Sequence, residues 1–167
     1  MRPLLDDGWT LVAARDSDFD EVMTWFSDAA SVDRWAGPQF RFPFTRESFI
    51  EDCRPDIATS YALRDADGRT AAFGQTCERY GRGHLLRLVV NPRLRRQGAG
   101  TRLIRMLIAS LEQSDDYDEY SLFVYRDNIP AYHCYLSLGF AVTDYPEDGL
   151  LADKCYFLTK PATRSET

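Results

Sequence analysis

The segment from His84 to Ser110 places an apolar strand, a glycine-containing turn and an amphipathic helix directly after one another. The strand is a nearly continuous apolar run, typical of a strand covered on both faces: Leu85, Leu86, Leu88, Val89 and Val90. Asn91-Pro92 ends this strand, because proline cannot donate a hydrogen bond to a neighbouring strand. Apolar residues then recur at helical spacing from Leu103 to Leu111. The pattern therefore predicts a strand–turn–helix unit around which the rest of the chain is organised.

The turn inside this unit is predicted to bind an anion. A glycine-containing turn that leads into a helix leaves several backbone N–H groups unpaired and pointing the same way. The turn contains Gly98 and Gly100, and three arginines surround it: Arg93, Arg95 and Arg96. Phosphate is the expected anion. A nucleoside-triphosphate loop of the Walker A type is excluded, because no Gly-Lys-Ser/Thr sequence follows.

The overall composition is that of a soluble globular protein, with 44% hydrophobic and 28% charged residues. The chain has 167 residues, so one domain over residues 1–161 with a frayed tail at 162–167 is expected. A formal net charge of -6 argues against nucleic acid as a partner. No apolar run approaches the ~20 residues that span a bilayer. Acidic residues stand where a signal peptide needs its apolar core, so the expected location is the cytoplasm.

The four cysteines are widely separated and form no C-x-x-C pair: Cys53, Cys77, Cys134 and Cys155. Zinc-ligand spacing is therefore absent, and no metal is expected. The thiols are predicted to be reduced and to pack as small hydrophobic side chains.

The remaining elements are expected from periodicity and turn residues. Strands are predicted at 9–14, 60–64, 69–77, 120–125, 140–143 and 155–159, and further helices after Asp18, after Thr45 and from Asn128 to Gly139. The order β-α-α-β-β-β-α-β-α-β-β predicts a mixed α+β fold, an α/β sandwich. Its central sheet is expected to be mostly antiparallel, with a parallel pair created by the central helix.

An aromatic-rich segment from Val32 to Phe44 is predicted to contain no long regular element, because glycine and proline interrupt it. Its aromatic residues are Trp35, Phe40, Phe42 and Phe44. Such a segment can be a packed core loop or a wall of a binding cleft, and the sequence leaves both readings open.

Two motifs resemble those of a known family. RRQGAG at residues 95–100 is similar to the [RQ]-x-x-G-x-[GA] signature of the GNAT superfamily of acyl-CoA-dependent N-acetyltransferases. NIPAYHCYLSLGF at residues 128–140 is similar to that family's N-x-x-A-x-x-x-Y-x-x-L-G-F. The separation of the two motifs and the order of elements also match. The resemblance implies a GNAT fold, with the parallel strand pair splayed at the cofactor site.

The resemblance further implies acetyl-CoA as co-substrate and a set of residues that hold it. Backbone N–H groups of the turn would bind the pyrophosphate. The residues that supply them are Arg95, Arg96, Gln97, Gly98, Ala99, Gly100 and Thr101. A bulged strand would pair with the pantetheine arm through Leu88, Val89 and Val90. Asn128 matches a cofactor-contacting asparagine of the family, although capping of the following helix explains it locally as well.

The catalytic candidates are Tyr135 and His84. Tyr135 matches the phenol that gives a proton to the departing CoA thiolate, and it could equally be a core tyrosine. His84 stands where some members of the family carry a general base, with Glu78 or water as alternatives. Members that acetylate the N-terminal alanine of ribosomal proteins have a glutamate where this chain has Phe123, so their base and substrate do not carry over.

The resulting hypothesis is an N-acetyltransferase that acts by direct attack in a ternary complex. The acceptor would be a primary amine, either a small molecule or the N-terminus of a protein or peptide. It is expected to enter between the Trp35–Phe44 segment and the Asp144–Asp148 turn. The alternative is a non-catalytic acyl-CoA-binding sensor or interaction domain on the same fold. Neither nucleic acid nor a membrane is expected as a partner, and a homodimer is a further possibility.

Overall fold

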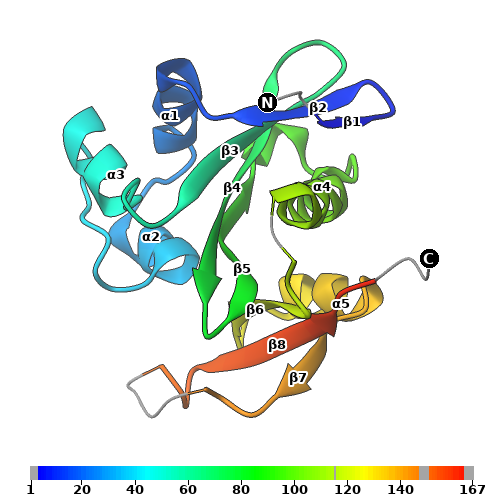
Figure 1. Cartoon of the computed structure of the whole chain (residues 1–167). Helices are drawn as coiled ribbons and strands as arrows, with labels where there is room; N and C mark the ends of the chain where they lie inside the picture. Colours follow the sequence, from blue (N-terminus) through cyan, green and yellow to red (C-terminus); the bar gives the residue numbers. More distant parts are fainter. Residues whose placement is uncertain (1–3, 115, 147–150, 164–167) are drawn as a thin grey trace.

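A computed structural model describes residues 4–114, 116–146 and 151–163, which form one eight-stranded sheet with helices on both faces (Figure 1). The strands are β1 (Leu4–Asp6), β2 (Trp9–Ala13), β3 (Thr59–Arg64), β4 (Thr70–Arg79), β5 (Arg82–Val90), β6 (Glu119–Tyr125), β7 (Ala141–Thr143) and β8 (Cys155–Pro161). The helices are α1 (Asp16–Met23), α2 (Ala29–Ala36), α3 (Arg46–Asp52), α4 (Ala99–Ser114) and α5 (Ile129–Ser137), with a short 3-10 turn η1 at Pro92–Leu94.

The strand order in the sheet is β1-β2-β3-β4-β5-β6-β8-β7. Within the described residues, every neighbouring pair is antiparallel except β5 and β6, which are parallel. The long connection through α4 produces this one parallel pair, because a parallel partner requires a crossover. The predicted mixed α+β architecture is confirmed.

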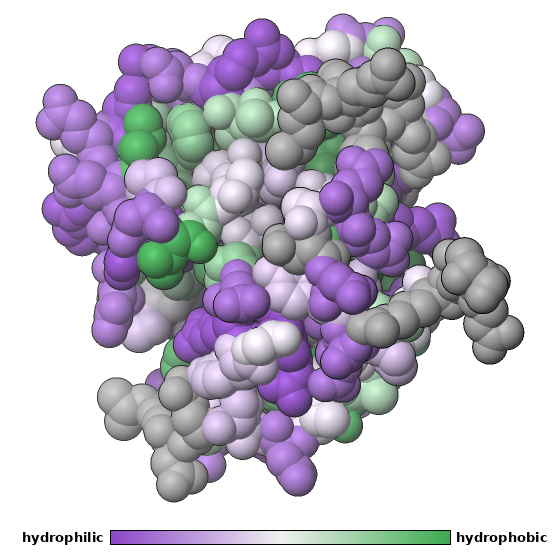
Figure 2. Space-filling view, viewed as in Figure 1, coloured by the Kyte–Doolittle hydropathy of each residue, from purple (hydrophilic) through white to green (hydrophobic). Residues whose placement is uncertain are grey.

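Two cores hold the helices against the sheet. The larger core lies under α4, whose buried side chains Leu103, Ile104, Leu107 and Leu111 pack on the sheet, and α5 borders it. The second core lies under α1, α2 and α3 on the opposite face (Figure 1) and is built largely from aromatic rings: Phe19, Phe40, Phe49 and Phe73. Figure 2 shows mostly hydrophilic side chains on the viewed surface, with apolar ones in small separate groups.

The Val32–Phe44 segment begins inside helix α2, which the expected element order lacks, whereas residues 37–44 form no regular element, as expected. Asp28 caps α2, since its carboxylate accepts a hydrogen bond from the Ser31 backbone N–H at 2.8 Å. Gly37 then ends the helix, and both prolines of the segment lie beyond it. The glycine and prolines of the segment therefore end the helix but do not prevent it from forming. The aromatic rings of the segment pack together, as a core loop would, with Trp35 stacked on Phe49 at 5.8 Å.

The first strand of the structure is also absent from the predicted order. β1 pairs with β2 in a tight hairpin, with Leu4 opposite Leu11 and Asp6 opposite Trp9. A strand of three residues at the edge of a sheet is too short to show alternation in a sequence. The later elements agree with expectation, including the β7–β8 pair and the end of the second motif's helix before Gly139.

The four cysteines are free thiols, as predicted, and Cys53 and Cys155 are buried. No helix in the described part of the chain is both long enough and apolar enough to cross a membrane.

Candidate functional site

The candidate site is centred on the point where β5 and β6 part. These strands are nine and seven residues long, yet only two residue pairs are in register, Gly83 with Tyr120 and His84 with Ser121. Beyond His84 the two strands diverge, whereas the opposite edge of β6 is paired with β8 over its whole length. The β6-facing edge of Leu88–Val90 therefore has no ladder partner among the described residues. An unpaired strand edge is a ready template for another extended chain.

A β-bulge interrupts the regular pairing of β5 just before this open edge. The register between β4 and β5 shifts between Phe73 and Gln75, and Arg87 has a φ of 50°. Such a φ marks a local irregularity for a residue with a side chain. Opposite the bulge, an added Cβ on Gly74 would lie 2.9 Å from Leu88 Cδ2 and 3.0 Å from Leu107 Cδ1, so these side chains would have to shift to accommodate any other residue. The bulge expected from the family resemblance is present, and Gly74 is a supporting residue that sequence reasoning missed.

The predicted anion-binding turn follows directly. Asn91 anchors its start, because the side chain donates to the Thr70 carbonyl at 3.0 Å and accepts from the Arg93 backbone N–H at 2.9 Å. Residues Arg95, Arg96, Gln97 and Gly98 are exposed, and α4 begins at Ala99. The first-turn N–H groups of a helix lack acceptors within the helix, and here they face the turn. Ala99, Gly100 and Thr101 provide these groups.

Gly98 is the residue of this turn whose backbone most needs glycine, with a φ of 77°. At Gly100 an added Cβ would make only an ordinary contact of 3.6 Å with Val90 Cγ2, so packing within the protein does not demand glycine there. Arg102, in the first turn of α4, contacts the preceding turn. It donates to the Gln97 carbonyl at 2.8 Å and lies over the Trp9 ring at 4.7 Å.

The two sequence motifs meet in space at the first turn of α4. Thr101 Oγ1 lies 3.9 Å from Cys134 Sγ, which places α5 beside the anion-binding turn. Tyr135 follows Cys134 on α5, is partly exposed, and borders the larger core. Burial raises the pKa of the Tyr135 phenol above its usual range, with a smaller contribution from Cys134. Among the described residues none hydrogen-bonds to the Tyr135 hydroxyl, and with its pKa raised the phenol is protonated at neutral pH.

Asn128 precedes α5 but does not cap it through its side chain. This corrects the capping interpretation, since the local hydrogen bonds of Asn128 come from its backbone: its N–H donates to the Tyr125 carbonyl at 3.0 Å, and its carbonyl accepts from the Tyr132 N–H at 3.0 Å. The Asn128 amide is therefore left for another partner. The neighbouring Asp127 pairs with Arg34 of α2 at 3.1 Å, which connects the two faces of the molecule near the open end of β6.

His84 lies at the apex where the strands part, with a side chain that is 1% exposed. Its Nδ1 is hydrogen-bonded to Ser121 Oγ at 2.8 Å, and Phe123 packs edge-on against the ring at 5.3 Å. Burial, and to a smaller extent the charge of Arg79, lowers the pKa of His84 to about 3. The imidazole is therefore neutral at physiological pH. Glu78, the second candidate for proton removal, is exposed near the end of β4.

This buried neutral histidine predicts a specific acid sensitivity. Between pH 6.5 and about 3 the unfolded chain binds a proton at His84 that the folded chain does not. The free energy of unfolding should therefore decrease by about 1.4 kcal/mol for each unit by which the pH is lowered in this range. Urea unfolding measures this free energy at pH 6.5 and at pH 5. Its decrease between the two pH values should be about 2 kcal/mol larger for the wild type than for His84→Gln. The exposed His133, changed to glutamine, is the control, and parallel losses in the wild type and His84→Gln would refute the assignment.

The turn expected to border the acceptor lies only partly within the described residues. Asp144 is exposed just after β7, whereas Glu147 and Asp148 lie outside the described residues. Phe123 is partly exposed on β6 and contacts Tyr145 at 5.3 Å. This flank of the site is therefore aromatic, as expected from the phenylalanine that the sequence carries at this position.

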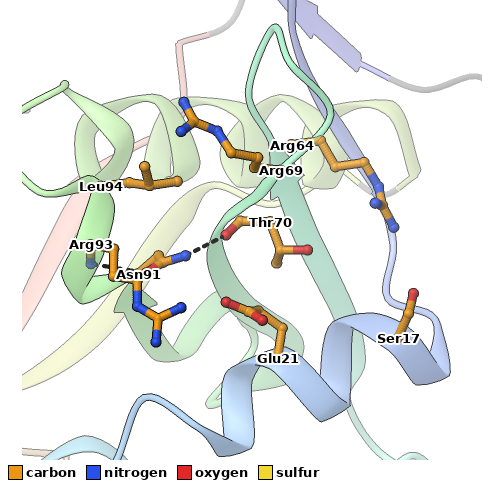
Figure 3. A pocket seen from close by; sticks show the side chains of 8 residues that line it. All are labelled: Ser17, Glu21, Arg64, Arg69, Thr70, Asn91, Arg93 and Leu94. Atoms are coloured by element: carbon orange, nitrogen blue, oxygen red, sulfur yellow. Dashed lines mark hydrogen bonds between the residues drawn. The ribbon is translucent and has the colours of Figure 1, made fainter.

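A separate cavity of about 400 Å³ opens between α1, the β3–β4 hairpin and the β5–α4 connection (Figure 3). Two of its arginines are already engaged by carboxylates. Arg64 donates to both oxygens of the buried Asp18 at 2.8 and 2.9 Å, and Arg69 Nε donates to Asp65 at 2.7 Å. Two of the three arginines that line this cavity are therefore already paired with carboxylates, and the turn at the start of α4 stays the predicted anion site.

Comparison with known proteins agrees with this geometry. The family model described as the acetyltransferase (GNAT) family matches residues 29–140, which include both motifs. The spermidine N-acetyltransferase from Vibrio cholerae, solved in complex with CoA and spermine, superposes with a TM-score of 0.73 at 14% identity, over 93% of this chain and 96% of that one.

Two further solved structures share the fold. The PaiA N-acetyltransferase from Thermoplasma acidophilum, in complex with coenzyme A, has a TM-score of 0.69 at 17% identity, over 92% of this chain and 99% of that one. AAC(6')-Ib, in complex with Parmomycin and AcetylCoA, has a TM-score of 0.70 at 18% identity, over 93% of this chain and 94% of that one.

Proposed function

Since this chain belongs to the acetyltransferase (GNAT) family, we propose that it transfers the acetyl group of acetyl-CoA to a primary amine. The acceptor amine is carried by a small molecule or by the N-terminus of a peptide or protein. The observation that carries the proposal is the contact between Thr101 and Cys134, which brings the anion-binding turn next to the helix of Tyr135. One extended molecule with a phosphate group and a reactive thioester would engage both.

The residues around the open edge of β5 fit CoA. The backbone N–H groups from Arg95 to Thr101 would bind the pyrophosphate, with Arg95 and Arg96 adding positive charge. The unpaired edge of Leu88–Val90 would pair with the amides of pantetheine, and the free amide of Asn128 would contact the cofactor. Acetyl-CoA supplies the activated acetyl group in this site.

Tyr135 supplies the proton that the departing thiolate needs. The phenol is protonated at neutral pH, as a general acid requires, and burial raises its pKa further above that range. The proton lost by the amine leaves through water. His84, with a pKa of about 3, is a poor destination for a proton, and its hydrogen bond to Ser121 suits a role in holding the apex of the diverging strands. The amine attacks directly in a ternary complex, without a covalent enzyme intermediate.

The proposal predicts acetyl-CoA cleavage that depends on an acceptor. Thiol release from acetyl-CoA, measured across primary amines, amino acids, polyamines and peptides with free N-termini, should rise well above hydrolysis for at least one acceptor class. N-acetylated peptides and the corresponding alcohols are the matched blanks. Binding of CoA without acceptor-dependent release across the whole panel would contradict acetyl transfer and support the acyl-CoA sensor instead.

A further inference from the structure

Arg87 is a partly buried cation at the centre of the candidate site. It occupies the bulge of β5, and its guanidinium lies over the Phe40 ring, with Cζ 5.6 Å from the centroid. Nη1 donates to Gln75 Oε1 at 2.8 Å. Gln75 is fully buried and is held by hydrogen bonds from its own amide to the Cys53 carbonyl and to Ser60 Oγ. The guanidinium is therefore held in a defined position.

No negative charge in the described part of the chain pairs with Arg87. The carboxylate whose charge acts on it, that of Asp52, is bound by Arg41 through several hydrogen bonds of 2.9–3.2 Å. The neighbouring thiols are neutral, because burial raises the pKa of Cys53 to about 12 and also raises the pKa of Cys77. Arg87 Nε is buried without a hydrogen-bond partner. A guanidinium stays protonated in proteins, and burying it without a counter-charge is costly.

The place of Arg87 along β5 relates this cation to the chemistry. If the turn at Arg95–Thr101 holds the pyrophosphate and Leu88–Val90 pair with pantetheine, Arg87 comes next, at the acyl end of the cofactor. Its contacts with Phe40 and Gln75 put the guanidinium on the face of α1, α2 and α3. Tyr135 belongs to the opposite face, with α4 and α5. An acceptor that approaches the acyl group from the α1–α3 face would meet Arg87.

On the premise of the acetyl transfer proposed above, we propose that Arg87 binds a carboxylate of the acceptor, which is therefore an amino acid or another amine with a carboxylate near its amino group. A guanidinium matches a carboxylate in geometry and charge, and such hydrogen bonds are the strong ones. A polyamine would instead bring positive charge against an uncompensated cation. The acceptor preference of this chain thus differs from that of the Vibrio cholerae spermidine N-acetyltransferase, with which it shares the fold.

The first test measures binding without requiring turnover. CoA-loaded protein is titrated calorimetrically with each standard amino acid and with the amine that lacks its carboxylate, such as L-phenylalanine and 2-phenylethylamine. At least one amino acid should bind about 10- to 100-fold more tightly than its partner amine. If no amino acid binds more tightly than its amine, or if spermidine binds most tightly, the assignment is wrong.

The second test identifies Arg87 as the source of the preference. Arg87→Gln should reduce the affinity for the best amino acid to that of its amine, while the Kd for CoA stays within about twofold. Arg46→Gln removes the same charge from an exposed ion pair on α3 and should change neither. A preference that survives in Arg87→Gln, or a variant that weakens CoA alone, would overturn the proposal.

The two tests separate this inference from the proposed function. Selective binding of amino acids that depends on Arg87, with no acetyl transfer to them, would retain the carboxylate site and refute the transferase. Acetyl transfer to simple amines with no advantage for carboxylate-bearing ones would retain the transferase and refute the role of Arg87.

Discussion

Replacing Tyr135 with phenylalanine should lower kcat by about 100- to 10,000-fold, the range attributed to general acid–base catalysis. The change removes only the hydroxyl, so the ring contact with Phe140 at 6.4 Å and the packing of α5 are retained. The thiolate would then leave without a proton donor. Steady-state kinetics with saturating acceptor measure the loss, and calorimetry with CoA should give an affinity within about twofold of the wild type.

Tyr132→Phe is the matched control for this prediction. Tyr132 lies one turn earlier on α5 and packs against Tyr156 at 4.9 Å, outside the motif position of the acid. Its substitution should leave kcat nearly unchanged. If Tyr135→Phe also retains wild-type kcat, the phenol does not protonate the leaving group, and the residue is a core tyrosine as the helical periodicity alone would allow.

Gly98→Val should weaken CoA binding by about 100-fold or more. Gly98 has a φ of 77°, which a β-branched residue adopts only with strain. The backbone must shift to relieve that strain, and the N–H groups of the turn then no longer converge on one point. Loss of two charge-assisted hydrogen bonds of about 1.5–3 kcal/mol each accounts for this loss of affinity. Calorimetric titration with CoA gives the affinity directly.

Gly68→Val provides the control for Gly98→Val. Gly68 has a φ of 83° in the turn between β3 and β4 and is not among the residues proposed to bind CoA, so valine introduces comparable local strain at a position outside that set. Thermal unfolding should show similar destabilisation for both variants, and only Gly98→Val should lose CoA. Retained CoA binding in folded Gly98→Val would mean that the turn does not hold the pyrophosphate.

Local sequence patterns were sufficient for most of the sheet and for the helix that follows the anion-binding turn. The apolar spacing from Leu103 to Leu111 and the residues around Asn91-Pro92 act within a few positions of one another, and the structure agrees with both. The three-residue β1 and the single helix α2 were missed, because their signals are short or lie next to stronger breakers. The motif at residues 128–140 carried the prediction that α5 belongs to the same site, and the Thr101–Cys134 contact agrees with it.

The chemical state of the site residues could not be predicted in the same way. From the sequence alone, His84 is a histidine near a turn, for which an ordinary pKa close to neutral pH is expected. In the fold it is buried beside Ser121 and Phe123, residues 37 and 39 positions away, and its pKa drops to about 3. Arg87 drew no attention in the sequence, because its neighbours Gln75 and Phe40 come from other elements.

The sequence by itself determined the strand–turn–helix unit from His84 to Ser110, its glycine turn and its downstream partner motif, because periodicity, turn chemistry and motif spacing are local properties. Only the tertiary structure decided where β5 and β6 part, that His84 is buried and neutral, and that no carboxylate among the described residues pairs with Arg87. Desolvation and charge pairing depend on residues that are distant along the chain, and no local pattern records them.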